Sequence, residues 1–335
     1  MGKSLKIVAD EAIPFLDGVF DPWADTIRRP GREIGPRDVD GADALIVRTR
    51  TRCGEELLRD SSVRLIATAT IGFDHIDLAY CRRRGIRVAT AAGCNARGVL
   101  QWVAGVLAHL ARRQDWRPEE RTLGIVGVGH VGALVKRYAE SWGFRVLCCD
   151  PPREERERLG FLPLDEVARR SDLITFHTPL DDSTRHLCDE RLLGLLPPGA
   201  TVINSSRGEV VSGEALLRSG HPYALDVWEH EPRLDAELLA GAEVATTHIA
   251  GYSLQGKATA SALSVQAVAE CFSLPLSGWY PAAAPPSRPR EIGWEELCRT
   301  IDTAFDCRRE TERLKRSPEA FERIRDNYAY REEYF

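Results

Sequence analysis

Three side chains of this sequence are suited to proton transfer beside a bound carboxylate: Arg207, Glu231 and His248. An arginine binds a carboxylate through two parallel hydrogen bonds. A histidine accepts or donates a proton near neutral pH, and a neighbouring carboxylate orients it and stabilises its charged form. The three residue types together are therefore typical of acid–base chemistry on a substrate that is itself an acid.

Each of these side chains follows an apolar, strand-like run, and the runs are Ala200–Asn204, Tyr223–Asp226 and Val244–Thr246. Ligands of α/β sheets bind outside the carboxyl ends of the strands. Taken singly, Arg207 could be a surface ion-pair partner, Glu231 a solvated loop acid and His248 a satisfied core histidine. Their joint placement after three strands favours a catalytic site.

A glycine motif follows the apolar run that begins at Leu123, and its three glycines are Gly127, Gly129 and Gly132. A helix-like stretch follows the motif, and the next apolar run ends at Asp150. The first glycine allows a tight turn, the second lets a pyrophosphate approach, and the third allows close helix–strand packing. Asp150 is placed to accept hydrogen bonds from an adenosine ribose and to repel a 2′-phosphate. Alone the motif could be a glycine-rich turn, but this order of strand, helix and acid predicts an NAD site.

With these motifs, the chain resembles the D-isomer-specific 2-hydroxyacid dehydrogenases, whose catalytic Arg, Glu and His correspond to Arg207, Glu231 and His248. Further segments are similar to members that act on 4-phospho-D-erythronate: Val8–Glu11, Val47–Thr51, Ala67–Asp77, Gly93–Val99, His248–Lys257, Phe321–Tyr328 and Arg331–Phe335. The resemblance covers nearly the whole chain. Three features depart from the pattern: Thr49 replaces a serine, Gln101 replaces an acid, and the region after Leu276 is short and rich in proline.

The resemblance implies NAD-dependent oxidation of 4-phospho-D-erythronate at C2, a step of pyridoxal 5′-phosphate biosynthesis. Arg207 would hold the substrate carboxylate, His248 would take the proton of the C2 hydroxyl, and Glu231 would hydrogen-bond His248. The cofactor contacts would be Gly127, Gly129, His130, Val131, Gly132, Asp150, Thr178, Ser205, Ser206, Arg207, Asp226 and Gly251, with Asp226 accepting from the nicotinamide carboxamide. The substrate contacts would be Thr49, Thr70 and Tyr252. The cations available for the phosphate are Arg48, Arg50, Arg52 and Arg97.

Two other functions stay open from the sequence. One is oxidation of a different acid, such as 3-phosphoglycerate or an unphosphorylated 2-hydroxy acid. The other is a non-catalytic regulator that senses NAD and binds partners. Thr49 and Thr70 could also be ordinary strand-end caps, and Tyr252 could simply pack against a hinge.

The elements that position these residues follow from periodicity. Within the first 95 or so residues, short apolar runs alternate with helical stretches, and the runs are Lys6–Ala9, Ala44–Val47, Leu65–Thr68 and Arg87–Thr90. Two helical segments, Arg97 to about Arg112 and Tyr252–Phe272, would cross between domains. We expect an α/β fold with two Rossmann-like, doubly wound parallel sheets. The substrate domain would comprise 1–96 with 250–275, and the NAD-binding domain 97–249.

The end of the chain has a different composition. A proline-rich stretch, Pro275–Pro289, predicts a linker or an extended arm. Beyond it, one apolar stripe at helical spacing is formed by Trp294, Leu297, Ile301 and Phe305. The resemblance implies that residues 276–335 form a small α+β or helical dimerisation segment, which would make a homodimer. The alternative is a helix folded back on its own chain.

Composition narrows the function classes. The 335 residues are 43% hydrophobic with a net charge of −5, which describes a globular protein and argues against general nucleic-acid binding. The nine cysteines are odd in number and form no Cys-x-x-Cys, so we expect free thiols and no metal site. Neither a membrane-length apolar run nor a signal-peptide core at Met1–Lys6 is present, so a cytoplasmic location without membrane partners is expected.

Overall fold

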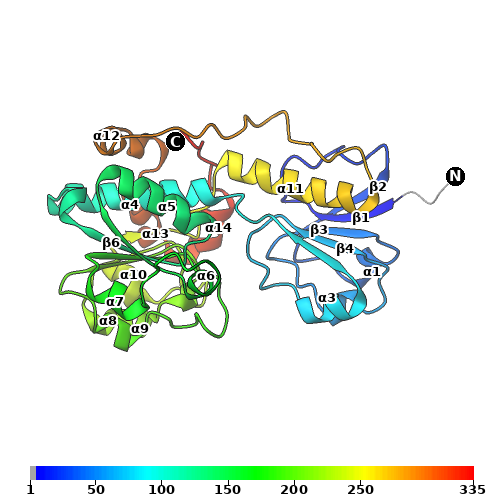
Figure 1. The fold of residues 1–335 in the computed structure, drawn as a ribbon. Helices are drawn as coiled ribbons and strands as arrows, with labels where there is room; N and C mark the ends of the chain where they lie inside the picture. The colour runs from blue at the N-terminus through cyan, green and yellow to red at the C-terminus, as the bar shows by residue number, and fades with distance from the viewer. Residues whose placement is uncertain (1–4) are drawn as a thin grey trace. The chain divides into compact units, whose positions relative to one another are not determined.

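A computed structural model describes residues 5–335; the expectation for Met1–Lys6 therefore lies largely outside the described residues. The chain forms two compact units (Figure 1). The first comprises the residues up to Asn95 together with Ser253–Ser287, and the second comprises Ala96–Tyr252 and Arg288–Phe335. Residues 276–287 thus belong to the first unit and residues 288–335 to the second.

The first unit contains a five-stranded parallel sheet in the order β2-β1-β3-β4-β5. Its strands are β1 (Leu5–Asp10), β2 (Ala24–Arg29), β3 (Ala44–Val47), β4 (Leu65–Thr68) and β5 (Arg87–Thr90). The sequence predicted every strand of this sheet except β2. That strand lies at the sheet edge, and Ile27 is its only large aliphatic residue, so its sequence lacks the apolar run of a central strand.

Helices cover both faces of this sheet, as Figure 1 shows. They are α1 (Pro36–Val39), α2 (Glu55–Leu58), α3 (Leu78–Arg84) and α11 (Leu254–Phe272). Alternate strand residues face opposite sides: Ile7 and Ile46 share a core with Val268 of α11, whereas Val8 and Leu45 belong to the core that contains Tyr80 of α3. The return segment after residue 252 therefore completes the first unit by covering one face of its sheet.

The second unit contains a six-stranded parallel sheet in the order β11-β10-β9-β8-β6-β7. Its strands are β6 (Thr122–Val126), β7 (Arg145–Cys149), β8 (Leu173–Phe176), β9 (Thr201–Asn204), β10 (Tyr223–Leu225) and β11 (Val244–Ala245). Its helices before the C-terminal segment are α4 (Ala96–Gln114), α5 (His130–Trp142), α6 (Pro151–Glu157), α7 (Leu164–Arg169), α8 (Glu190–Leu193), α9 (Gly213–Ser219) and α10 (Ala236–Gly241). Short 3₁₀ turns lie at Pro118–Glu120, Gly208–Val210 and Pro318–Ala320. The strand order reverses beside β6, which is where sheets of this type bind their ligands.

The C-terminal segment, residues 288–335, packs on the second unit of its own chain. It contains α12 (Trp294–Ala304), α13 (Cys307–Arg316) and α14 (Phe321–Asp326). Leu297, Ile301 and Phe305 of the predicted stripe are fully buried in one core with α4. Thr311 Oγ1 accepts the backbone N–H of Ala245 over 3.0 Å, so α13 covers the edge strand β11. The predicted helical stripe is confirmed, and it folds back on its own chain; dimerisation stays a prediction.

Both parallel-sheet units confirm the predicted α/β fold class. The described residues, 5–335, contain no helix that is both long and apolar enough to cross a membrane. Their nine cysteines are all free. Burial raises the pKa of the Cys53 and Cys188 thiols to about 12, so both are protonated at neutral pH. In the same part of the chain, no group of three or more His, Cys, Asp or Glu residues is arranged to hold a metal ion.

Candidate active site

In the glycine loop between β6 and α5, Gly127 and Gly132 are closely packed, whereas Gly129 faces open space. Gly127 has φ +84°, and a Cβ there would lie 2.9 Å from the carbonyl of His177. A Cβ on Gly132 would lie 2.0 Å from the carbonyl oxygen of Gly127. By contrast, no atom lies within 4 Å of a Cβ built on Gly129, the N-cap of α5. The loop is therefore shaped so that a phosphate can approach the first N–H groups of the helix, at His130 and Val131.

Asp150, directly after β7, forms a hydrogen bond with the backbone of this loop. Its Oδ2 accepts the backbone N–H of Val128 over 2.8 Å, and its Oδ1 accepts that of Arg153 over 3.0 Å. The carboxylate thus joins the glycine loop to the start of α6. Its remaining lone pairs can still accept hydrogen bonds from ribose hydroxyls.

Two hydroxyls at the ends of neighbouring strands have no partner. The buried Thr178 Oγ1, after β8, and Ser205 Oγ, after β9, form no hydrogen bond among residues 5–335. Buried polar atoms are normally paired, so these two indicate where polar groups of a ligand would lie. Together with the open Gly129 and the Asp150 carboxylate, they fit a dinucleotide. The Ser206 hydroxyl donates to Asn204 Oδ1 over 2.8 Å.

Arg207 lies on a rigid loop. Asn204, the buried last residue of β9, accepts the Ser206 N–H at Oδ1 and donates from Nδ2 to the Arg207 carbonyl over 2.7 Å. A Cβ on Gly208 would lie 2.1 Å from the carbonyl carbon of Trp228, so the loop touches the backbone of the loop that follows β10. The Arg207 guanidinium donates to the Ser206 carbonyl over 2.7 Å. Local bonds therefore fix the backbone from which Arg207 projects.

Asp226 organises the segment that contains His248. Its side chain is buried; Oδ1 accepts the Ile249 N–H over 2.8 Å and the Thr246 hydroxyl over 2.6 Å, and Oδ2 accepts the Ala250 N–H over 2.9 Å. The Asp226 carbonyl accepts the His248 N–H over 2.7 Å. His248 has φ +59°, a left-handed conformation that is unfavourable for a residue with a side chain. The four bonds to Asp226 hold it there, next to Gly251 and Tyr252.

Glu231 and His248 form a hydrogen-bonded pair. His248 Nδ1 lies 2.9 Å from Glu231 Oε2, and Glu231 Oε1 accepts the Trp228 N–H over 2.9 Å. Burial raises the pKa of Glu231, but His248, Arg325 and the Trp228 N–H together outweigh burial and hold that pKa below its ordinary value of 4.5. The ionised carboxylate can only accept, so Nδ1 carries the hydrogen of the neutral imidazole. Nε2 forms no hydrogen bond within residues 5–335 and is thus the nitrogen that can accept a proton.

The C-terminal segment adds two arginines to which the sequence gave no role. Arg325 donates from Nε to the Tyr252 hydroxyl over 3.1 Å, and its Nη1 lies 4.0 Å from Glu231 Oε2. Arg331 is buried and donates to the carbonyls of Gly98, Ile249 and Ala250. In the sequence, the only indication of either residue was the similarity of the C-terminal segment to relatives. No short-range sequence pattern links these arginines to His248.

The predicted substrate contacts of the first unit lie at strand ends. Thr49 is exposed two residues after β3. Thr70, two residues after β4, donates to the Gly72 carbonyl over 3.0 Å, which is the contact of an ordinary strand-end cap. Arg48 pairs through Nε with the buried Asp10 over 2.9 Å. Of the other suggested cations, Arg52 is exposed, Arg50 is partly buried, and Arg97 Nη1 lies 3.5 Å from the Tyr138 hydroxyl in the second unit.

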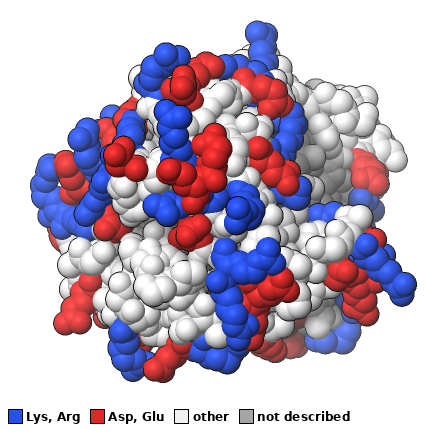
Figure 2. Space-filling view, turned by 60° about the vertical axis from the view of Figure 1, so that its left-hand side comes forward, with Lys and Arg blue, Asp and Glu red and all other residues white. Residues whose placement is uncertain are grey.

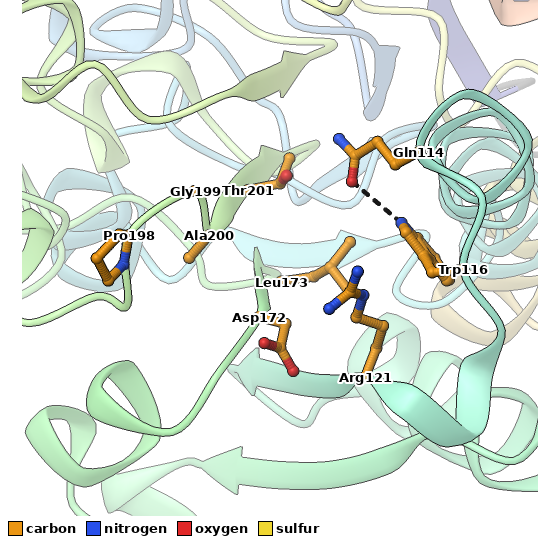
Figure 3. Close-up of a pocket in the computed structure, with 9 residues that line it drawn as sticks. All are labelled: Gln114, Trp116, Arg121, Asp172, Leu173, Pro198, Gly199, Ala200 and Thr201. Carbon is orange, nitrogen blue, oxygen red and sulfur yellow. Dashed lines mark hydrogen bonds between the residues drawn. The ribbon is translucent and has the colours of Figure 1, made fainter.

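A polar hollow of about 170 Å³ lies at the opposite ends of the second sheet's strands (Figure 3). Arg121, Asp172 and Ala200 line it, and they precede β6, β8 and β9 respectively. Asp172 Oδ2 already accepts the Thr122 N–H over 2.7 Å. The hollow is therefore separate from the carboxyl ends, where the candidate residues lie.

Surface charge is mixed on the face that Figure 2 shows, where basic and acidic side chains are interspersed. This pattern agrees with the near balance of 45 basic and 50 acidic residues in the chain. A nucleic-acid site would instead require a clustered basic patch or stripe.

Comparison with known proteins identifies close relatives. Residues 97–250 match the family model described as D-isomer specific 2-hydroxyacid dehydrogenase, NAD binding domain. An erythronate-4-phosphate dehydrogenase of Bacteroides fragilis is 42% identical over 98% of this chain and 97% of its own length. One from Cronobacter sakazakii is 39% identical over 98% of this chain and 92% of its own. The crystal structure of D-lactate dehydrogenase from Aquifex aeolicus, complexed with NAD and lactic acid, is 25% identical with a TM-score of 0.68 and covers 84% of this chain and 99% of its own.

Proposed function

This chain belongs to the family of D-isomer-specific 2-hydroxyacid dehydrogenases, and we propose that it oxidises the C2 hydroxyl of 4-phospho-D-erythronate with NAD. The product would be 2-oxo-3-hydroxy-4-phosphobutanoate. The observation that carries this proposal is the Glu231–His248 pair, which leaves His248 Nε2 available in a chain similar over nearly its full length to erythronate-4-phosphate dehydrogenases.

Arg207, Glu231 and His248 have distinct roles in this proposal. Arg207 binds the substrate carboxylate through its guanidinium and polarises the neighbouring C2 oxygen. His248 Nε2 accepts the proton of the C2 hydroxyl, and the ionised Glu231 stabilises the imidazolium that forms. Acid–base catalysis by a positioned side chain contributes roughly 10²- to 10⁴-fold to the rate. Bound NAD supplies the hydride acceptor, C4 of the nicotinamide.

The remaining contacts are also part of the proposal. Asp226 accepts a hydrogen bond from the nicotinamide carboxamide at Oδ2, whose one partner among residues 5–335 is the Ala250 N–H. Tyr252, whose hydroxyl accepts from Arg325 Nε over 3.1 Å, binds substrate. Thr49 and Thr70 bind substrate from the ends of β3 and β4.

We further propose that the reaction serves pyridoxal 5′-phosphate biosynthesis in the cytoplasm, and that the protein is a homodimer. The chain ending that is similar to relatives supports an assembly role for residues 276–335. Helices α12 and α13 already pack on their own unit, so a dimer would use the outer faces of the segment. Sedimentation equilibrium distinguishes monomer from dimer.

The test is NAD-dependent oxidation of 4-phospho-D-erythronate compared with 3-phosphoglycerate, with the keto acid product measured as well as NADH. The proposal expects a strong preference for the erythronate and a loss of about 10²-fold or more in His248→Ala. Equal or better use of 3-phosphoglycerate would contradict the assigned substrate. NAD binding without oxidation of either acid would favour a regulator that senses NAD.

A further inference from the structure

Arg325 lies beside the proton-transfer pair although it belongs to the C-terminal segment. It lies on the short helix α14, and its Nε donates to the Tyr252 hydroxyl over 3.1 Å. Its Nη1 lies 4.0 Å from Glu231 Oε2, which in turn accepts from His248. Only the Glu231 side chain therefore lies between the Arg325 guanidinium and His248, the proposed base.

The terminal nitrogens of Arg325 remain available for a ligand. A guanidinium has five N–H donors, but the bond from Nε to Tyr252 is the only hydrogen bond that Arg325 forms within residues 5–335. Its side chain is 18% exposed. Arg331 provides the contrast, because it is buried and donates to three backbone carbonyls. Arg331 is thus structural, whereas Arg325 presents unused donors.

The proposed substrate requires a second cation. It carries a carboxylate next to C2, assigned to Arg207, and a phosphate on C4. A dianion taken from water into a site requires paired charge and hydrogen bonds. Arg48 is already bonded to the buried Asp10 through both Nε and Nη2. Arg325 Nη1 and Nη2 instead form no hydrogen bond within residues 5–335, and their fork matches two phosphate oxygens.

Part of this chain has no counterpart in the structure of a dehydrogenase whose substrate is an unphosphorylated acid. The structure of D-lactate dehydrogenase from Aquifex aeolicus in complex with NAD and lactic acid, an acid without a phosphate, aligns over 99% of its own length but over only 84% of this chain. The erythronate-4-phosphate dehydrogenase of Bacteroides fragilis covers 98% of this chain. The share of this chain that the lactate enzyme leaves uncovered is similar in size to residues 288–335, which contain Arg325.

We propose that Arg325 is a specificity-determining residue that binds the C4 phosphate of the substrate through Nη1 and Nη2. The hydrogen bond from Nε to Tyr252 fixes the plane of the guanidinium and thereby the direction of the fork. This assignment rests on the proposed function, since it names the group that binds one end of that substrate. It also gives the C-terminal segment a function within its own chain.

The first test compares two substrates that differ only in the phosphate, 4-phospho-D-erythronate and D-erythronate. For Arg325→Gln, kcat/KM should fall about 10- to 100-fold on the phosphorylated acid, mainly through KM, and change little on D-erythronate. Arg325→Lys keeps the charge but not the fork and should lose less. Arg323→Gln, an exposed arginine on the same helix, is the matched control and should resemble the wild type. Equal losses on both substrates would overturn the proposal, because Arg325 would then act through Glu231 and His248.

The second test needs no turnover. Calorimetric titration of the NAD-saturated protein with inorganic phosphate should show binding in the wild type and Arg323→Gln, and weaker binding by about 10- to 100-fold in Arg325→Gln. Unchanged NAD affinity and melting temperature establish that the variant is folded. The assignment is overturned if the wild type does not bind phosphate. It is also overturned if Arg325→Gln binds phosphate as tightly as the wild type. If the wild type oxidises neither acid, the proposed function fails, and this titration still decides whether Arg325 binds phosphate.

Discussion

Asp226 holds His248 in its left-handed conformation from the neighbouring strand end. The Asp226 carbonyl accepts the His248 N–H over 2.7 Å, and the carboxylate of the same residue accepts the next two N–H groups. A single buried aspartate therefore fixes the backbone on both sides of the histidine ring. The direction of that ring is set separately by Glu231, which bonds to Nδ1.

Asp226→Asn should destabilise the protein and slow the reaction. The amide NH₂ would face a backbone N–H, and a buried donor left without a partner costs about 1–3 kcal/mol. We expect a lower free energy of unfolding by about 2 kcal/mol in urea, together with a reduced kcat. Asp235→Asn is the control, because this exposed residue caps α10 and asparagine caps helices equally well. Equal stability of the two variants would show that the Asp226 contacts are not needed.

Gly208→Ala tests the contact between the loops that carry Arg207 and Glu231. The added methyl would lie 2.1 Å from the Trp228 carbonyl carbon, so one of the two backbones must move. A displacement of about 1 Å at a catalytic group can cost roughly 10²-fold in rate. We expect kcat/KM to fall by more than tenfold. Gly278→Ala, where no atom lies within 4 Å, should have no effect; full activity of Gly208→Ala would contradict the rigid-loop interpretation.

Asp150→Ser should reduce the preference for NAD over NADP. Serine can still cap α6, but it removes the negative charge that repels a 2′-phosphate and one acceptor for the ribose. The ratio of Kd values for the two cofactors, measured by fluorescence titration, should shift toward NADP by on the order of tenfold. Asp172→Ser, at the opposite ends of the strands, is the control. An unchanged ratio in Asp150→Ser would remove Asp150 from the cofactor site.

Glu231 should contribute stability that disappears in acid. Its pKa in the folded protein lies below the ordinary value of 4.5, so the ionised form stabilises the fold above that value. The contribution is lost as pH falls through the folded pKa. The difference in unfolding free energy between the wild type and Glu231→Gln should be constant from pH 6 to about 5 and narrow below about pH 4.5. Urea unfolding at pH 3.5–6 measures it; a difference that grows with acid would have the wrong sign.

Strands were predicted best from the sequence where their burial produces an unbroken run of apolar residues. Strands β3 and β4 are buried along their whole length, so their apolar runs gave both boundaries. The edge strand β2 lacks such a run and was missed. Glycine spacing predicted the loop before α5 because steric rules act locally.

The supporting contacts of the site could not be predicted, because they depend on tertiary structure. Thr246 donates to Asp226 across a separation of 20 residues, and Arg325 donates to Tyr252 across 73. The periodicity of apolar residues in the sequence does not reveal pairs that are so far apart along the chain. Resemblance named Arg207, Glu231 and His248, but only the folded structure shows which of their atoms form hydrogen bonds and which donors form none.

The most direct test of hydride removal from C2 uses 4-phospho-D-erythronate with deuterium at C2. The protein is mixed with this substrate and NAD for a single turnover, and the nicotinamide is analysed by mass spectrometry. The deuterium should be found in the reduced nicotinamide, and the rate of its transfer should fall about 10²-fold or more in His248→Ala. Deuterium released into water, or an unchanged rate in His248→Ala, would contradict it.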